Sequence, residues 1–305
     1  MATVDLHLHS TGSDGSRSPS WLVEQASSSG FLALSITDHD TFCGIPEAGA
    51  AAAATGLTLI PGIELSVELH CGGSAHMLAY FPTQPAETWS GGSVEQALTG
   101  VRRARDERNV RIVDRLVEMG VPLTMREVEE QSGGGVTGRL HIATLMVLKG
   151  VVKSTEQAFR DYLGRGAPAY VPRERLGDYR AMGLIRENRG IPVLAHPGLL
   201  ENRGESQIRA LAASLRDEGL MGIEVFYPSH DGRFIGFLLE TARDLGLMVT
   251  GGSDFHGVDD RDSFPPAEGG FRVDSGQVEA FLEACRSMER EGVAAWQNSA
   301  TWSRP

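Results

Sequence analysis

The stretch Val4-Asp5-Leu6-His7-Leu8-His9-Ser10 carries the first signal of the fold. Apolar and polar residues alternate along it, which is the pattern of a β-strand whose successive side chains point to opposite faces. His7 and His9 therefore lie on one face of the strand, one pleat apart. Two imidazoles placed in this way suit a metal such as Zn, Mn or Fe.

Most of the other histidines also occur near the ends of short apolar runs. These runs carry the segments Thr37-Asp38-His39-Asp40, Ala75-His76, Ala195-His196-Pro197 and Ser253-Asp254-Phe255-His256, and a further run ends at Glu64. Imidazoles and carboxylates that converge from several strand ends predict a cluster of divalent metals. A core of buried ionisable groups without metals or partners would be costly, which disfavours the alternative of a purely structural polar core.

Each of these residues has an ordinary explanation when it is taken alone. A histidine before proline, such as His196, is more often structural than a ligand, and Asp14-Gly15 is a common turn sequence. The joint placement favours the metal interpretation, because six of the nine histidines and three acids (Asp14, Glu64 and Asp254) fall at the same end of consecutive predicted strands.

Short runs rich in Val, Ile and Leu alternate with amphipathic helical stretches, which predicts a largely parallel α/β architecture. Ser18 and Pro19 mark the start of the first helix, and Gly56 the end of an alanine-rich one. A last helix spans about Gln277–Arg290. The predicted strands are Val4–His9, Leu32–Thr37, Leu57–Glu64, His76–Phe81, Pro192–Ala195, Gly222–Phe226 and Leu247–Gly251.

The alternation stops between about Ser93 and Leu163, where the pattern is purely helical. Capping-box sequences begin at Thr124 and Ser154 within this region. A helical insertion next to the strand ends that carry the ligands is well placed to cover the site and select the substrate.

The composition limits the partners of the protein. Among the 305 residues 41% are apolar, and the net charge is −12 without any block rich in lysine or arginine. Binding of duplex nucleic acid over an extended surface is therefore disfavoured, whereas bound metal ions can hold a phosphate even in an acidic protein. No apolar run is long enough to predict a membrane span, and the strand that begins at Val4 predicts no signal peptide. Three cysteines without a CxxC pair predict free thiols in a cytoplasmic protein.

Taken together, these motifs resemble those of the PHP (polymerase and histidinol phosphatase) phosphoesterases, particularly the small-nucleotide phosphatases with a helical insertion. The motifs are His7-Leu-His9-Ser, Thr37-Asp-His39-Asp, Gly62-Ile-Glu64, Ala195-His196-Pro197 and Gly252-Ser-Asp254-Phe-His256. The resemblance implies a distorted (β/α)₇ barrel. We expect residues 1–92 and 166–292 to form the barrel, 93–165 a helical cap, and 293–305 a peripheral tail.

The resemblance also implies a site for two to three divalent ions at the carboxyl ends of the strands. His7, His9, Glu64 and Asp254 would hold the first ion, Glu64, His76 and His196 the second, and Asp14, His39 and His256 the third. Asp14 replaces a histidine found in some members, which favours Mn or Mg over Zn at the third position; Fe is also possible in principle for such ligands. Two ions can share a hydroxide that attacks phosphorus, and a third can offset the charge that develops in the transition state.

Three further residues are candidates for substrate contacts. Arg139 and His141 follow a glycine-rich loop, and the Arg-x-His-x-Ala pattern resembles the substrate-facing segment of the family. Arginine is suited to a bidentate contact with phosphate, although a solvated Arg139 and a surface His141 are the alternative. His230 could protonate the leaving group or bind substrate, or it could cap a loop.

The sequence thus predicts a metal-dependent phosphoesterase that acts on a small nucleotide. The leading substrate is a nucleoside 3′,5′-bisphosphate, which would give the nucleoside 5′-monophosphate, such as AMP, and phosphate. Short oligoribonucleotides cleaved from one end and histidinol phosphate are alternatives. Many metal-dependent amidohydrolases would be expected to carry a carboxylated lysine that bridges their metals. That activity is disfavoured here, because the only lysines, Lys149 and Lys153, do not lie at strand ends. A non-catalytic, metal-stabilised binding module is disfavoured by the complete ligand set. The pattern does not indicate an oligomeric state.

Overall fold

The computed structural model describes residues 2–83, 93–133, 136–172, 175–257, 263–266 and 270–291. The tail expected at 293–305 lies outside these residues. The strands are β1 (Thr3–Leu8), β2 (Phe31–Ile36), β3 (Thr58–Leu59), β4 (Gly62–Glu68), β5 (Ser74–Tyr80), β6 (Leu176–Gly177), β7 (Ile191–Leu194), β8 (Gly222–Phe226), β9 (Met248–Gly251) and β10 (Val273–Asp274).

The α-helices surround these strands or extend above them. They are α1 (Pro19–Ser28), α2 (Ile45–Thr55), α3 (Ser93–Glu118), α4 (Met125–Gln131), α5 (Arg139–Leu148), α6 (Thr155–Ala158), α7 (Asp178–Glu187), α8 (Glu205–Asp217), α9 (Gly232–Leu245) and α10 (Glu279–Glu291). A π-helical turn, η2 (Phe159–Leu163), continues α6. None of the helices within the described ranges combines the length and the apolar character of a membrane span.

The strands form two sheets, in the orders β10-β1-β2-β3 and β6-β4-β5-β7-β8-β9. Two isolated bridges, Leu8 with Phe255 and His39 with Glu64, join the sheets. The bridges and the ladders connect β1, β2, β4, β5, β7, β8 and β9 in a ring. The expected α/β fold is therefore confirmed, and two isolated bridges, not a continuous ladder, link the two sheets in the arrangement expected for a distorted barrel.

Two details of the strands differ from the prediction. The run Leu57–Glu64 is divided into β3 and β4, and β4 continues past Glu64 to Glu68, so Glu64 does not end its strand. The strand β5 runs antiparallel to both β4 and β7, while the other contacts around the ring are parallel. Because β5 is reversed, its amino end brings His76 to the edge where the parallel strands present their carboxyl ends.

The predicted helix boundaries rest on local hydrogen bonds. The hydroxyl of Ser18 accepts from the N–H of Trp21 at the start of α1. Gly56 ends α2 in the left-handed conformation with φ of 76°, which glycine adopts without the penalty of a Cβ. In the insertion, Thr124 and Glu127 form the reciprocal capping box at the start of α4.

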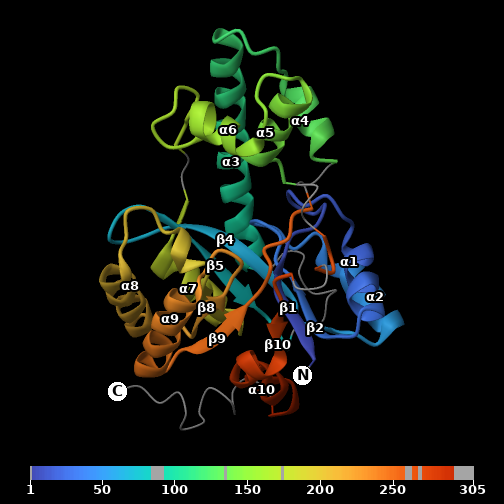
Figure 1. The fold of residues 1–305 in the computed structure, drawn as a ribbon, viewed down its shortest axis with the longest axis vertical. Helices are drawn as coiled ribbons and strands as arrows, with labels where there is room; N and C mark the ends of the chain where they lie inside the picture. Colours follow the sequence, from blue (N-terminus) through green and yellow to red (C-terminus); the bar gives the residue numbers. More distant parts are fainter. Residues whose placement is uncertain are drawn as a thin grey trace.

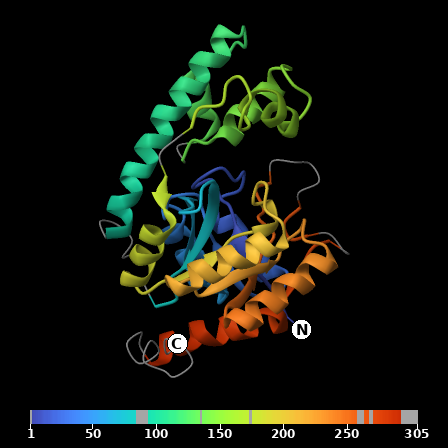
Figure 2. The ribbon, with the colours of Figure 1, turned by 90° about the vertical axis from the view of Figure 1, so that its left-hand side faces the viewer.

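The insertion rises above the barrel as a separate layer (Figures 1 and 2). The first turns of α3 bury Val94, Leu98 and Val101 in the barrel core. Further along, α3 contributes Ile112 and Leu116 to a second apolar core, which α4, α5, α6 and η2 complete. The long helix α3 thus connects the two cores. We use the name cap for the second core and the helices that enclose it.

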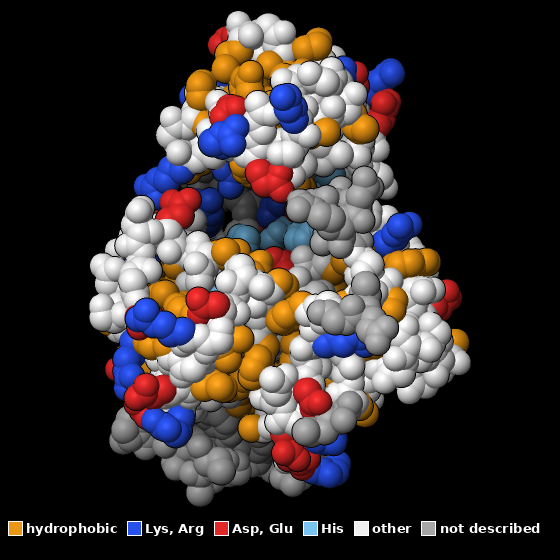
Figure 3. Space-filling model, viewed as in Figure 1, with side chains coloured by type: hydrophobic (Ala, Val, Ile, Leu, Met, Phe, Trp, Pro, Cys, Tyr) orange, Lys and Arg blue, Asp and Glu red, His pale blue; other side chains and the backbone are white. Residues whose placement is uncertain are grey.

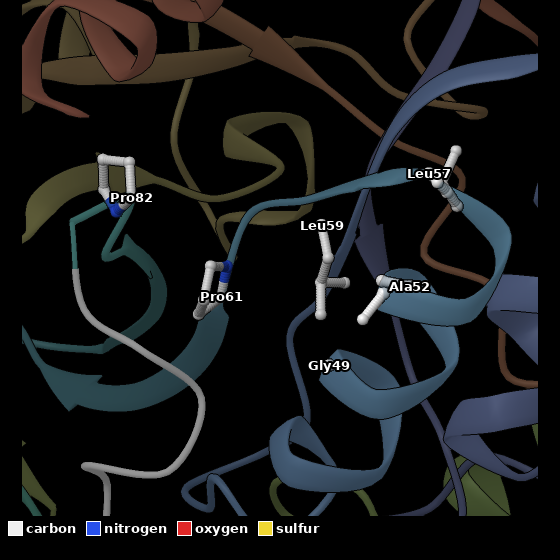
Figure 4. Close-up of a pocket in the computed structure, with 8 residues that line it drawn as sticks. Gly49, Ala52, Leu57, Leu59, Pro61 and Pro82 are labelled. Carbon is white, nitrogen blue, oxygen red and sulfur yellow. The ribbon is translucent and has the colours of Figure 1, made fainter. Parts of the chain in front are cut away.

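A shallow pocket lies on the outside of the barrel beside α2 (Figure 4). Only small and apolar residues line it: Gly49, Ala52, Ala53, Gly56, Leu57, Leu59, Pro61 and Pro82. The pocket contains no group that could bind a metal or transfer a proton, so the candidate site lies elsewhere.

Candidate metal centre

Four predicted ligands meet at the top of the barrel. One donor atom from each of His7, His9, Glu64 and Asp254 lies within 4.8 Å of the others. The Nε2 atom of His9 is 3.0 Å from Asp254 Oδ1 and 3.2 Å from Glu64 Oε2. This is the group that the resemblance implies for the first ion.

A second group consists of His9, Asp14, His39 and His256, with donor atoms again within 4.8 Å of one another. Asp14 Oδ1 is 3.4 Å from Nε2 of His256. The set contains the three residues expected for the third ion, together with His9.

The third group consists of His39, Glu64 and His76. Glu64 Oε1 lies 2.8 Å from Nδ1 of His76 and 2.8 Å from Nε2 of His196, while Oε2 lies 3.0 Å from Nδ1 of His39. The structure therefore brings all nine predicted ligands together, with Glu64 at the centre. The resemblance assigns His39 to the third ion only, but the structure also places it next to Glu64.

The chemistry of these side chains fits divalent cations. Nδ1 of His39, Oε2 of Glu64 and Oδ1 of Asp254 are buried, and although other donor atoms of the cluster lie about 3 Å away, none of the three forms a properly oriented hydrogen bond with a described residue. Buried polar atoms without partners are rare in folded proteins, and several of them converging on one point are what a metal site presents before the ion is added. The mixture of imidazole and carboxylate donors suits Mn, Fe, Zn or Mg.

The ligands perturb the ionisation of one another. Burial disfavours the charged form of His9, but the adjacent carboxylates of Asp254 and Glu64 outweigh this effect and raise its pKa to about 10. Burial likewise opposes ionisation of Glu64, yet the charges of His76, His39 and His7 hold its pKa well below the usual value. Without a cation, these groups therefore favour the ionic form, in which protonated imidazoles face ionised carboxylates. A bound cation would take the place of the imidazole protons.

Two buried polar residues that the sequence analysis did not select support the ligands. The carboxylate of Glu224 lies 2.9 Å from Nδ1 of His7, and the hydroxyl of Tyr227 donates to Oδ2 of Asp254 at 2.9 Å. A carboxylate on the second ring nitrogen turns Nε2 of His7 toward the other candidate ligands. The sequence contains a signal for Glu224, because it is an acid between the apolar residues of a buried strand.

The backbone is also unusual at the centre. Among the described non-glycine residues, Asp40, His196 and Asp254 have positive φ angles of 52°, 22° and 53°. Such conformations are costly and persist where surrounding contacts hold them, commonly at functional sites. The N–H of Asp40, for example, donates to the carbonyl of Glu64, and that of His196 donates to Oε2 of Glu224.

The three candidates for substrate contacts occupy different environments. Arg139 donates to the carbonyl of Leu163 and lies over the rings of Phe159 and Tyr170. These contacts place its guanidinium in the cap, where burial and the charge of Arg175 lower its pKa.

His141 is buried at the start of α5, and its Nδ1 accepts from the N–H of Gly138. Nε2 therefore carries the proton of the neutral ring. Burial lowers the pKa of His141, and the charges that act on it include those of Asp14 and His256. In contrast, both nitrogens of His230 contact backbone groups, the carbonyl of Val225 and the N–H of Gly198. This geometry favours the loop-capping alternative for His230.

A hollow separates the cap from the barrel, and histidine side chains are visible inside it (Figure 3). Lysine or arginine side chains line part of its upper wall, and acidic side chains lie at its rim in the same view. The hollow therefore opens to solvent between the cap and a floor that contains histidine.

The chain is similar to curated proteins over most of its length. It is 33% identical to a 3′,5′-nucleoside bisphosphate phosphatase of Chromobacterium violaceum, with 95% of this chain and 96% of the relative covered. It is 35% identical to a 5′-3′ exoribonuclease of Haemophilus influenzae, with 83% and 89% covered. A phosphoribosyl 1,2-cyclic phosphate 1,2-diphosphodiesterase of Eggerthella lenta is 30% identical, with 83% and 94% covered.

Solved structures show the same similarity. A Chromobacterium violaceum protein described as an amidohydrolase, with bound sulfate and no metal, superposes with a TM-score of 0.80 at 30% identity, and the match covers 97% of each chain. A Bifidobacterium adolescentis protein gives 0.78 at 30% identity, covering 92% of this chain and 96% of that one. The model of the PHP domain matches residues 5–225. From its ligand geometry, its fold and this match, the chain belongs to the PHP domain family.

Proposed function

We propose that this protein is a metal-dependent phosphoesterase that removes a phosphate from a small nucleotide. The leading substrate is a nucleoside 3′,5′-bisphosphate, and the products are the nucleoside 5′-monophosphate and phosphate. The observation that carries the proposal is the clustering of three donor groups, two of which share Glu64, beneath the cap. The similarity to the bisphosphate phosphatase, which extends over nearly the full length of both chains, supports this substrate.

The described ligands would accommodate two to three divalent ions. His7, His9, Glu64 and Asp254 would hold one, His39, Glu64, His76 and His196 a second, and Asp14, His39 and His256 a third. Bound ions of this kind supply a nucleophile at neutral pH and neutralise negative charge on the reacting phosphate.

The residues of the chain contribute position and proton control. Glu224 and Tyr227 orient His7 and Asp254 by the hydrogen bonds described above. His141 carries its proton on Nε2 and interacts electrostatically with Asp14, so it can donate a hydrogen bond to a phosphate or to a leaving oxygen near the third group. The contacts of Arg139 favour a structural role in the cap over a phosphate contact.

Exonucleolytic cleavage of short oligoribonucleotides is the second candidate. The similarity to the exoribonuclease of Haemophilus influenzae favours it. Both reactions break the P–O3′ bond of a 5′-phosphorylated nucleoside, and the cap would limit how much of a chain can enter. The amidohydrolase alternative gains no support from lysine: Lys149 contacts Glu127 and the carbonyl of Pro122 within the cap.

The test is product analysis with protein reconstituted with Mn²⁺, Fe²⁺, Zn²⁺ or Mg²⁺: phosphate release for the phosphomonoesters, and chromatography of nucleotides or DNA fragments for the phosphodiesters. The panel contains a nucleoside 3′,5′-bisphosphate, a 5′-phosphorylated dinucleotide, histidinol phosphate and duplex DNA. We expect the bisphosphate to have the highest kcat/KM and duplex DNA to remain intact, with only a weak dependence on salt. Preferential turnover of the dinucleotide would select the exoribonuclease, and efficient internal cutting of duplex DNA would contradict the proposal.

A further inference from the structure

Arg105 is a buried arginine that projects from α3 into the junction between the cap and the barrel. Its side chain is only 6% exposed, and it forms an ion pair with Asp40 through one terminal nitrogen, Nη2. Asp40 follows the ligand His39 directly, and its N–H donates to the carbonyl of Glu64 at 3.0 Å. The guanidinium is thus anchored next to the backbone that carries two of the metal ligands.

The ion pair with Asp40 does not satisfy the whole guanidinium. Nε of Arg105 is buried and has no hydrogen-bond partner among the described residues. If Arg105 only linked α3 to the barrel, Nε would stay buried without an acceptor, which costs the free energy of its desolvation. The ion pair thus leaves part of this permanently charged group without an acceptor, and an anion on the Nη1 side would add one.

The position of Gly138 shows where such an anion would lie. A Cβ on Gly138 would be 3.4 Å from Nη1 of Arg105 and 3.6 Å from Oδ2 of Asp14, so both atoms border the same small space. His141, three residues further on, interacts electrostatically with Arg105 as well as with Asp14. Because Gly138 has no side chain, the space between the guanidinium and the third donor group stays free of protein atoms from that residue.

We propose that Arg105 binds a phosphate oxygen of the substrate from the cap side of the metal centre. Nη1 is the donor of the guanidinium that borders the space at Gly138, while Asp40 holds Nη2, so the two nitrogens can contact a phosphate oxygen and a carboxylate at the same time. The inference rests on the proposed function, and it assigns the phosphate contact to the barrel-facing part of α3 and not to Arg139.

The experiment measures binding of inorganic phosphate to the metal-loaded protein by calorimetry, so that it does not depend on turnover. Arg105→Ala and Arg105→Lys are compared with Arg103→Ala, which removes an arginine of the same helix whose side chain is 82% exposed. Metal content and Tm are recorded for each variant.

We expect Arg105→Ala to weaken phosphate binding by on the order of 100-fold, with the metal content retained. Free guanidinium should restore part of the affinity, since it can replace the missing group. Arg105→Lys should remain weak because an ammonium has a single nitrogen and cannot contact Asp40 and phosphate through separate nitrogens, and Arg103→Ala should match the wild type.

Wild-type phosphate affinity in Arg105→Ala at full metal content would overturn the proposal. If the alanine variant loses metal or unfolds, Arg105→Lys decides: wild-type affinity in that variant would overturn the contact through Nη1. A wild-type protein that binds phosphate through Arg105 but hydrolyses none of the substrate panel would instead refute the proposed function and leave this contact standing.

Discussion

Nδ1 of His7 lies 2.9 Å from one oxygen of Glu224, and the other oxygen accepts from the N–H of His196 at 2.7 Å. One buried carboxylate therefore orients the imidazole of one metal ligand and the backbone of another. Removing such a support typically costs 10- to 100-fold in metal affinity.

Glu224→Gln should weaken metal binding by about 10-fold or more, because the amide has a single oxygen and cannot accept from both His7 and the N–H of His196. Titration of the metal-free protein with Mn²⁺ measures the change. The control is Glu240→Gln, whose side chain is 58% exposed on α9 and which should bind as the wild type does. Unchanged affinity in Glu224→Gln would show that His7 does not depend on this support.

Glu64→Gln should disturb more than one metal position at once. Its two oxygens face different imidazoles, with Oε1 at His76 and His196 and Oε2 at His9 and His39. Elemental analysis of the purified variant should therefore show a loss of more than one equivalent of metal relative to the wild type. A full complement of metal in this variant would rule out the central position of Glu64.

Metal affinity should increase as the pH rises from about 6 to 8. The pKa of His9 is raised to about 10 because adjacent Asp254 and Glu64 outweigh its burial, so the metal-free site binds protons that a cation must displace. Each displaced proton makes the affinity roughly tenfold stronger per pH unit. Calorimetry in buffers of different ionisation enthalpy measures the proton release, and heats that are independent of the buffer would contradict it.

The metal-free protein should show the opposite trend in stability. The raised pKa of His9 contributes stability that is fully present below its ordinary value of 6.5 and is lost as the pH rises toward about 10. Urea unfolding of the metal-free protein at pH 6.5 and pH 9 should thus give a lower free energy of unfolding at the higher pH. Addition of metal should remove or reverse this difference.

Gly252→Ala should damage the metal centre through the backbone of β1. A Cβ at this position would lie 2.4 Å from both N and Cβ of His7, so His7 must move. We expect a loss of about 1–3 kcal/mol in the free energy of unfolding together with weaker Mn²⁺ binding.

Gly236→Ala is the matched control for this substitution. It lies on α9 with no atom within 4 Å of the added Cβ, and alanine favours the helix by about 0.5–1 kcal/mol. Urea unfolding should therefore rank Gly236→Ala at or above the wild type and Gly252→Ala below it. Equal stability of the two variants would mean that β1 adapts to the extra carbon.

The sequence by itself determined the α/β class, most strand positions and which residues are available as metal ligands. These features are local: the alternation around His7 and His9 follows from the two-residue period of a strand, and Ser18 and Gly56 act on the backbone of their own helices. The PHP motifs combine such local patterns, so they can be recognised without coordinates.

Only the tertiary structure decided which groups meet across the barrel. The reversal of β5 depends on its pairing with β4 and β7, and it is this pairing that brings His76 to Glu64. Arg105 follows the helical spacing of Leu98, Val101 and Ile112, so the periodicity of α3 places it on the buried face and Arg103 on the exposed one. Its partner Asp40 is 65 positions away, and only the packing of the cap on the barrel brings the two together.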